Sequence, residues 1–359
     1  MTHFVTEGFH HVTMVSADAQ RTLNFYRDLL GLSLVKKTVN FDVPETYHLY
    51  FGDSTGRPGS LLTFFEWPHA ARGRYGVGGV HHVALGISGE TVQLKWKRRL
   101  KDHGVRVSGP YDRGYFCSIY FTDPDGQVLE IATEGPGFAI DEPQEALGQE
   151  LKIPDSKRLP GERDESWIAA QIYPQPVPEI TPDMEISGIH HVTGHTDDLD
   201  QSHEFYTVAL GLRIVKKSLN QDDEKTLHYF WANYDGQRVL PSSDMTLFGW
   251  PEGSPNAREG TGQTHHVAYR ARDEAEQLTW REHLESIGFR VTDVKDRKYF
   301  KSIYFRTHDG MLVEIATDGP GFADDEDASS LGSALCLPEW LEPRRDEIES
   351  GLRPTVRGG

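Results

Sequence analysis

The chain has 359 residues, and its 55 acidic side chains outnumber 37 basic ones, which gives a net charge of −18. Nucleic acid and anionic lipid bind clustered positive charge, so this balance argues against both as partners. No apolar run approaches the ~20 residues that span a bilayer, and the first residues lack the pattern of a signal peptide. Two cysteines are too few for a disulfide framework. We expect a soluble, cytoplasmic protein.

The first half of the chain contains two similar series of elements. The motif HHVTM (10–14) predicts a strand, and leucines and Tyr26 at helical spacing predict a helix over 17–32 that stops at Gly31. Short apolar runs, YHLYFGD and SLLTFFEW, then predict strands. A second series opens on HHVAL (81–85), continues with a helix over 90–104 and closes with strands in CSIYFTDPDG and VLEIAT. Each series is therefore a module of one strand, one helix and about three strands.

The second half of the chain repeats the first. The motif GFHHVT (8–13) returns as GIHHVT (188–193), an offset of 180, and residues 114–138 return as residues 298–322, an offset of 184. Self-similarity at this level predicts duplicated structure. The chain is expected to contain a first domain (1–150), a Pro-rich linker (151–183), a second domain (184–330) and a C-terminal tail with a short helix (331–359).

Each of the four modules opens with two adjacent histidines. Because side chains alternate along a strand, the two are predicted to point to opposite faces. His82 then shares a face with Ala84 and Gly86. His81 shares the other face with Val83. The second histidine of each pair is therefore expected to line a cavity.

Each half also carries a glutamate inside an apolar strand. Glu130 follows His82 by 48 residues, and Glu314 follows His266 by 48. A buried carboxylate is costly unless it is paired or bound to a metal. Two imidazoles and one carboxylate form the facial triad of non-haem Fe(II) oxygenases. Two alternatives stay open, since a strand histidine is more often a hydrogen-bonded core residue and a glutamate can pair with a buried arginine.

Several motifs resemble a known family. The segments FYRDLLGL and FYTVALGL and the terminal DG…EI strands resemble the vicinal oxygen chelate superfamily. More closely, GFHHVTM, LVKKTVNFD, YHLYFGD, GRPG before LLTFF, and KDRKYFKSIYFR are similar to the ring-cleaving dioxygenases that act on hydroquinones. The resemblance implies an α+β fold with four βαβββ modules in two tandem vicinal-oxygen-chelate domains with curved mixed sheets.

The resemblance also implies a metal site between the first and fourth modules. Its expected ligands are His11, His266 and Glu314. The companions of these ligands would be His10, Thr13, His265, Arg297 and Tyr304. Unlike its hydroquinone-cleaving relatives, the chain keeps equivalents of every ligand in its second and third modules. These residues, a second candidate site, are His82, His191 and Glu130, with Tyr120 and Arg113 as companions.

The implied activity is extradiol-type cleavage of a hydroquinone or catechol with both atoms of O2, at Fe(II) or alternatively Mn(II). His10 or His265 would move the substrate proton, and Arg297 and Tyr304 would orient the phenolate. Its partners would be a small aromatic diol and O2, and a homo-oligomer stays open. Two rival functions are a glyoxalase-type metal-dependent lyase or isomerase and a non-catalytic small-molecule-binding resistance protein. The matched glutamates argue against the second rival, because a protein that only sequesters a molecule needs no metal triad.

Overall fold

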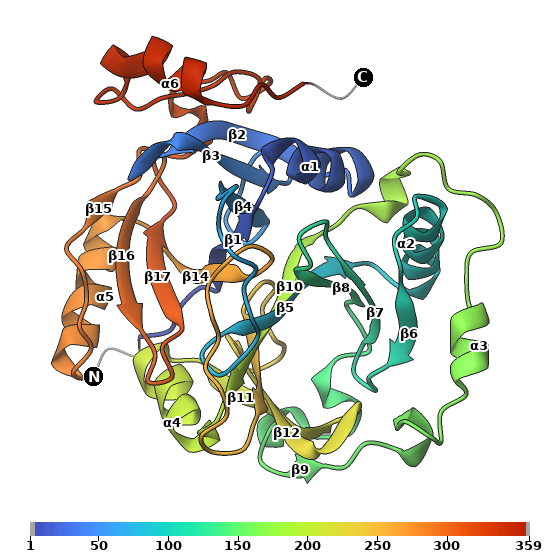
Figure 1. Cartoon of the computed structure of the whole chain (residues 1–359). Coiled ribbons are helices and arrows are strands. Elements are labelled where there is room, and N and C mark those ends of the chain that lie inside the picture. The colour runs from blue at the N-terminus through green and yellow to red at the C-terminus, as the bar shows by residue number, and fades with distance from the viewer. Residues whose placement is uncertain (1–3, 357–359) are drawn as a thin grey trace.

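The computed structural model describes residues 4–356 and contains two curved mixed sheets (Figure 1). Each sheet is built from two modules of one strand, one helix and three strands. Four modules of this kind confirm the α+β fold that the sequence predicts. The helix expected over 17–32 begins at Ala19 and ends in a π-helical turn at Leu29, and Gly31 follows with a φ of +72°.

Modules 1 and 2 lie in the first half of the chain. Module 1 contains β1 (Phe9–Ser16), α1 (Ala19–Leu23), η1 (Asn24–Leu29), β2 (Ser33–Asn40), β3 (Val43–Gly52) and β4 (Leu61–Glu66). Module 2 contains β5 (Val80–Ile87), α2 (Glu90–Asp102), β6 (Ser108–Asp112), β7 (Cys117–Thr122) and β8 (Val128–Thr133). The chain then runs through η2 (Phe138–Ile140), η3 (Gln144–Ala146), β9 (Leu151–Lys152), η4 (Ser156–Arg158), α3 (Glu165–Ala170) and η5 (Pro182–Met184).

Modules 3 and 4 follow in the second half. Module 3 contains β10 (Gly188–Thr196), α4 (Leu199–Glu204), η6 (Phe205–Ala209), β11 (Arg213–Asn220), β12 (Asp223–Ala232) and β13 (Asp244–Gly249). Module 4 contains β14 (Thr264–Ala271), α5 (Glu274–Ser286), β15 (Lys295–Asp296), β16 (Lys301–Arg306) and β17 (Leu312–Thr317). The short η7 (Phe322–Asp324) follows β17, and the tail carries η8 (Glu342–Arg344) and α6 (Arg345–Gly351) and packs over β2 and β3 (Figure 1).

Each sheet takes one module from each half of the sequence. The eight-stranded sheet has the order β15-β16-β17-β14-β1-β4-β3-β2, which joins module 1 to module 4. The nine-stranded sheet has the order β6-β7-β8-β5-β10-β13-β12-β11-β9, which joins module 2 to module 3. Antiparallel pairs β1–β14 and β5–β10 form the two junctions. The sequence repeat and the sheets thus divide the chain differently, and the domain boundaries given above stay a prediction.

Buried lysines connect the paired modules. Lys36 on β2 is fully buried, and its Nζ lies 2.6 Å from carboxylate oxygens of Asp325 and Glu326 in the loop after β17. Lys216 on β11 reaches Glu142, after β8, at 2.7 Å in the same way. A buried charge is tolerated when it is paired. These ion pairs therefore hold the outer strands of one module against the adjoining module.

The predicted orientation of the adjacent histidines is wrong. Between β1 and β14 the register passes from Phe9↔Tyr269 to His11↔Ala268, so His10 is an extra residue, and it shifts again at His265. The pair β5–β10 is bulged in the same two places, at His81 and His190. A β-bulge interrupts the alternation of side chains. In all four pairs the two rings consequently lie together, with their Nδ1 atoms 2.7–2.8 Å apart.

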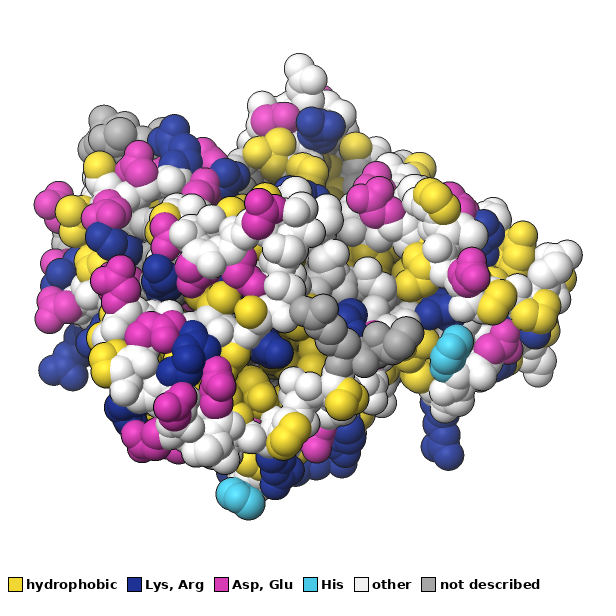
Figure 2. Space-filling model, turned by 90° about the horizontal axis from the view of Figure 1, so that it is seen from above, with side chains coloured by type: hydrophobic (Ala, Val, Ile, Leu, Met, Phe, Trp, Pro, Cys, Tyr) yellow, Lys and Arg dark blue, Asp and Glu magenta, His cyan; other side chains and the backbone are white. Residues whose placement is uncertain are grey.

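Histidine is concentrated in the interior, whereas the surface is rich in mixed charge. Acidic and basic side chains are interspersed over the face drawn in Figure 2, and histidines are scarce on it. Most of the histidines singled out from the sequence are therefore available only to groups inside the protein.

None of the helices within residues 4–356 has the length and apolarity required to span a bilayer.

Candidate metal centres

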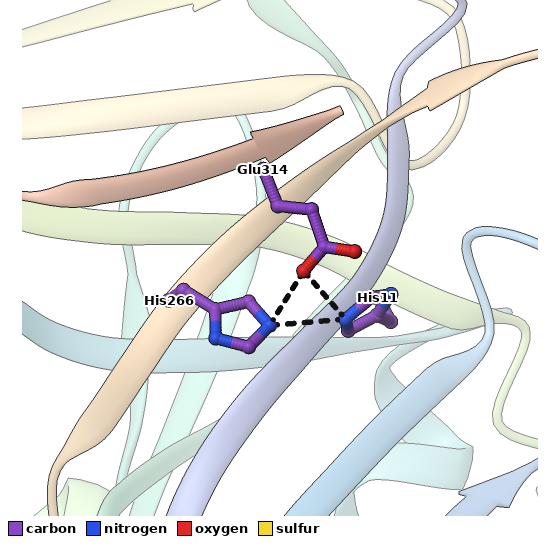
Figure 3. A group of neighbouring side chains, drawn as sticks. All are labelled: His11, His266 and Glu314. Carbon is purple, nitrogen blue, oxygen red and sulfur yellow. Dashed lines mark hydrogen bonds and ion pairs between the residues drawn. The ribbon is translucent and has the colours of Figure 1, made fainter. Parts of the chain in front are cut away.

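Three predicted ligands meet at the junction of modules 1 and 4. His11 projects from β1, His266 from β14 and Glu314 from β17, and Figure 3 shows the three side chains converging. The two Nε2 atoms lie 3.2 Å apart. Oε2 of Glu314 lies 3.5 Å from Nε2 of His11 and 2.9 Å from Nε2 of His266. All three side chains are buried. We call this group the first triad.

The spacing of these atoms suits one shared cation. Ligands about 2.1 Å from a divalent ion and at right angles to one another lie about 3 Å apart. Oε2 of Glu314 is fully buried, and apart from the two imidazoles it has no polar partner among the described residues. A buried carboxylate is costly unless it is paired or bound to a metal. The donor set and its convergence on this oxygen therefore fit a divalent metal with open coordination positions.

The protonation of the first triad also suits metal binding. Burial alone would raise the pKa of Glu314, but His11 and His266 outweigh it and hold the pKa well below its usual value. Burial lowers the pKa of His266 to about 4, although Glu314 opposes this. At neutral pH the carboxylate is ionised and the His266 imidazole is neutral. Metal ligands must be in these forms.

Neighbouring side chains fix the orientation of each ligand. Ser302 donates a 2.5 Å hydrogen bond to Oε1 of Glu314, which leaves Oε2 facing the histidines. Nδ1 of His265 lies 2.7 Å from Nδ1 of His266, and Nε2 of His265 lies 2.9 Å from Glu259. Outer partners of this kind set the tautomer and the ring orientation of a metal-binding histidine. Ser302, Glu259 and His265 are thus positioning residues.

The other predicted companions lie at different places around the first triad. His10 contacts His11 from behind, and burial lowers the pKa of His10 to about 3. Thr13 forms a 2.8 Å hydrogen bond with Thr63. Arg297 donates a 3.2 Å hydrogen bond from Nε to the Tyr304 hydroxyl. Of the five expected companions, Arg297 and Tyr304 line the adjoining cavity, His10 and His265 contact the ligand imidazoles from outside it, and Thr13 bonds Thr63.

The same constellation occurs at the junction of modules 2 and 3. Nε2 atoms of His82 and His191 lie 3.3 Å apart, and Oε2 of Glu130 lies 2.9 Å and 3.4 Å from them. Ser118 donates a 2.5 Å hydrogen bond to Oε1 of Glu130. Oε2 of Glu130 is buried without a hydrogen-bond partner in the described part of the chain. We call these three ligands the second triad, and it passes the same test of fit as the first.

The companions expected for the second triad are also in place. Arg113 donates a 3.1 Å hydrogen bond from Nη2 to the Tyr120 hydroxyl, as Arg297 does to Tyr304. Asp222 forms a 3.0 Å ion pair with Arg113. Thr193 contacts Nε2 of His82 at 2.9 Å. The two triads therefore have equivalent ligands, and each has an equivalent arginine–tyrosine pair beside it.

The cavities beside the two triads differ greatly in size. The first triad adjoins a cavity of about 20 Å³, which Phe41, Tyr50 and Phe300 help to line. The second triad opens on a chamber of about 630 Å³. A cavity of 20 Å³ has room for about one water molecule. Only the second chamber falls within the ~300–1,000 Å³ typical of small-molecule sites.

A third group of potential ligands is neutralised by a lysine. Asp325, Glu326 and Cys336 come within 4.8 Å of one another. Nζ of Lys36 lies 2.6 Å from both carboxylates and 3.7 Å from the sulfur. Because a cation is already present among these groups, the cluster is an ion pair and carries no metal assignment.

Sequence reasoning missed several residues around the triads. Ser118 and Ser302 stand at the same place in the repeated SIYF motif, which was the available signal. Glu259 and His195 interrupt the repeat, because their counterparts are Tyr75 and Val15, so comparison of the halves alone did not reveal them. His48 and His228, which match each other across the repeat, each form a hydrogen bond with a threonine and line a cavity.

Four βαβββ modules, with a buried triad of two histidines and one glutamate at each junction, define the vicinal-oxygen-chelate class. The chain belongs to the Glyoxalase/Bleomycin resistance protein/Dioxygenase superfamily, whose model matches residues 8–131 and 188–315. It is 35% identical over 352 residues to a Bacillus subtilis protein designated ring-cleaving dioxygenase MhqO, covering 97% of this chain and 96% of the relative. It is 29% identical over 350 residues to the chlorohydroquinone/hydroquinone 1,2-dioxygenase of Sphingobium indicum, covering 95% and 94%. A crystal structure of a Bacillus subtilis protein designated a dioxygenase has a TM-score of 0.77 and 33% identity, covering 98% of each chain.

Proposed function

We propose that this chain is a metal-dependent ring-cleaving dioxygenase that acts on a hydroquinone or catechol with O2. The observation that carries the proposal is the buried triad at each junction, in which one carboxylate oxygen and two imidazole nitrogens converge and the oxygen has no other polar partner among the described residues. Relatives named for this activity match the chain over nearly its whole length, which supports the same conclusion. Cytoplasmic location stays a prediction, and a homo-oligomer stays open.

His11, His266 and Glu314 would hold one metal, and His82, His191 and Glu130 a second. The metal is proposed to be Fe(II), with Mn(II) as the alternative, because one carboxylate and two imidazoles with open positions suit non-haem iron. When bound, the metal would act as a template and Lewis acid for the aromatic alcohol and O2.

The residues around the ligands would act by positioning and by proton placement. His10 and His265 hold the ligand imidazoles through their Nδ1 atoms, so we propose that they orient the ligands and do not carry substrate protons. Tyr304 accepts a hydrogen bond from Arg297, which leaves its own hydroxyl proton free for a substrate oxygen. Tyr120 is arranged in the same way by Arg113. Tyr304 and Tyr120 each present a hydroxyl proton beside their triad, and we propose that the tyrosine at the triad that receives the substrate orients the phenolic oxygen.

Oxygen consumption tests the proposed function. Protein purified and loaded anaerobically with Fe(II) is expected to contain close to two metal ions per chain and to consume O2 with at least one member of a panel of hydroquinones and catechols. Metal content near one per chain would remove the second triad from the proposal. No O2 consumption with any diol, combined with turnover of a hemithioacetal, would replace the dioxygenase by a glyoxalase-type lyase.

A further inference from the structure

The two triads are surrounded by different side chains where their cavities begin. Near the first triad, Phe41 lines the small cavity and packs edge-on against Trp340 of the tail, with ring centroids 5.7 Å apart. The counterpart of Phe41 in the repeat is Gln221. Gln221 is held aside because its Nε2 donates a 3.0 Å hydrogen bond to the carbonyl oxygen of Arg113. One aromatic ring thus fills the space that is open at the second triad.

The chamber of the second triad has apolar walls of the kind that hold an aromatic ring. Phe116, Phe248 and Trp250 line it together with the ligands His82 and His191. Aromatic side chains pack favourably against a ring in offset or edge-on geometry. A single-ring diol therefore has both walls to contact and a triad to bind in this chamber.

A histidine that is absent from the first triad also lines this chamber. His195 is buried, and its Nδ1 has no hydrogen-bond partner within residues 4–356. Its counterpart beside the first triad is Val15. A buried polar atom without a partner is costly. A bound molecule that forms a hydrogen bond with Nδ1 of His195 would remove this cost. The second hydroxyl of an aromatic diol is a group of the right chemistry.

The charge on the chamber wall limits the substrate further. Among the described residues that line it, Arg113 is the one lysine or arginine. Arg113 is already bonded to Tyr120 and to Asp222. Asp222, which also pairs with Arg163 behind the wall at 2.7 Å, and Asp223 line the chamber as well. An anionic substituent on the ring would meet these carboxylates without a free cation to balance it.

We propose that the aromatic diol binds at the second triad, in the chamber between modules 2 and 3, and that the first triad holds its metal in a closed pocket that excludes the ring. The preferred substrate is an uncharged aromatic diol, and the 630 Å³ chamber leaves room for substituents on its ring. This inference rests on the proposed function, and it specifies which of two nearly identical metal centres receives the substrate.

A reciprocal exchange at one pair of positions tests the inference. Binding of methylhydroquinone to the Fe(II)-loaded protein is measured by titration calorimetry without O2, and metal content is measured in the same samples. Gln221→Phe introduces at the second triad the ring that closes the first, and we expect at least tenfold weaker diol binding at unchanged metal content. Phe41→Gln, the reciprocal change, leaves the second triad untouched and removes the ring that closes the first, so we expect wild-type affinity at the second triad and a second binding event per chain. Glu130→Gln is expected to lose one metal per chain and the heat of diol binding.

The opposite pattern would overturn the inference. It would be overturned if Phe41→Gln weakened diol binding while Gln221→Phe left it unchanged, or if Glu314→Gln abolished diol binding while Glu130→Gln preserved it. Because carboxylates line the chamber, we expect 2,5-dihydroxybenzoate to bind at least tenfold more weakly than methylhydroquinone. Equal or tighter binding of the benzoate would contradict the preference for an uncharged diol. If the diol binds as expected and O2 is not consumed on admission of air, the dioxygenase function fails and the binding site stands.

Discussion

Single hydrogen bonds set the direction of the groups at both triads. Ser302 and Ser118 each occupy one oxygen of the buried glutamate, and the preceding histidine of each pair contacts the ligand imidazole. Such outer partners fix the rotamer and tautomer of a ligand before any metal arrives. The glutamate oxygen that faces the histidines is therefore held in place by a residue that never touches the metal.

Removal of one serine should weaken one metal centre. In Ser302→Ala, Glu314 loses its donor at Oε1, and the affinity of the first triad for metal is expected to fall about 10–100-fold. Ser118→Ala should weaken only the second triad by a similar factor, and it is the matched control. Competition titration with a chelator measures both affinities. Wild-type affinity at both centres in both variants would contradict a positioning role for these serines.

A buried carboxyl beside the second triad gives a pH-dependent prediction. Neither oxygen of Asp244 has a hydrogen-bond partner in the described residues. Burial raises the pKa of Asp244 from 3.8 to about 7, His191 opposes the shift, and Glu130 adds to it. The folded state therefore holds this proton more tightly than the unfolded chain. Ionisation of Asp244 costs stability progressively as the pH rises from about 4 to about 7.

Asp244→Asn should remove that cost. In metal-free protein at pH 8, the variant is expected to have an unfolding free energy higher than that of wild type by up to about 4 kcal/mol, and so to unfold at a higher temperature. This difference in unfolding free energy is the stability margin of the variant. The margin should shrink between pH 7 and pH 5, because the wild-type carboxyl becomes neutral. Thermal unfolding followed by circular dichroism gives both curves. A margin independent of pH would show that Asp244 is ionised in the folded protein or indifferent to burial.

At the scale of elements, the structure depends on contacts between modules that lie far apart in sequence. Strand β1 pairs with β14 and β5 pairs with β10, and all four strands are bulged at a histidine. Lysines on β2 and β11 reinforce the outer strands by ion pairs to loops of the adjoining module. The position of each triad thus depends on the junction of two modules.

Loss of the buried lysine should unfold the sheet more readily. Lys36→Met leaves the carboxylates of Asp325 and Glu326 without their cation, and breaking a buried ion pair typically costs about 3–5 kcal/mol. Equilibrium unfolding in urea measures the change. Lys152→Met, which removes a solvent-exposed pair with Glu150, is the control and should have a much smaller effect. Equal effects of the two substitutions would contradict the structural role of Lys36.

At the scale of the whole molecule, the repeat in the sequence predicted the four modules, their paired histidines and the two matched glutamates, whereas the two ligand sets came from the family resemblance. It could not predict which modules share a sheet, because similar modules offer similar edges, and the pairing of the first with the fourth came from the family resemblance. The bulges were missed because strand alternation was assumed at His10 and its equivalents. The difference between the chambers was missed because it depends on residues that break the repeat, such as Phe41 against Gln221 and Val15 against His195.

We propose that the duplicated chain holds two separate metal centres, one at each junction of modules. Anomalous scattering from crystals grown with Fe(II) or Mn(II) locates these metals in one measurement. We expect two peaks per chain, one among His11, His266 and Glu314 and one among His82, His191 and Glu130. A peak at only one triad, or bound metal with no peak at either, would show that the chain does not hold two such centres.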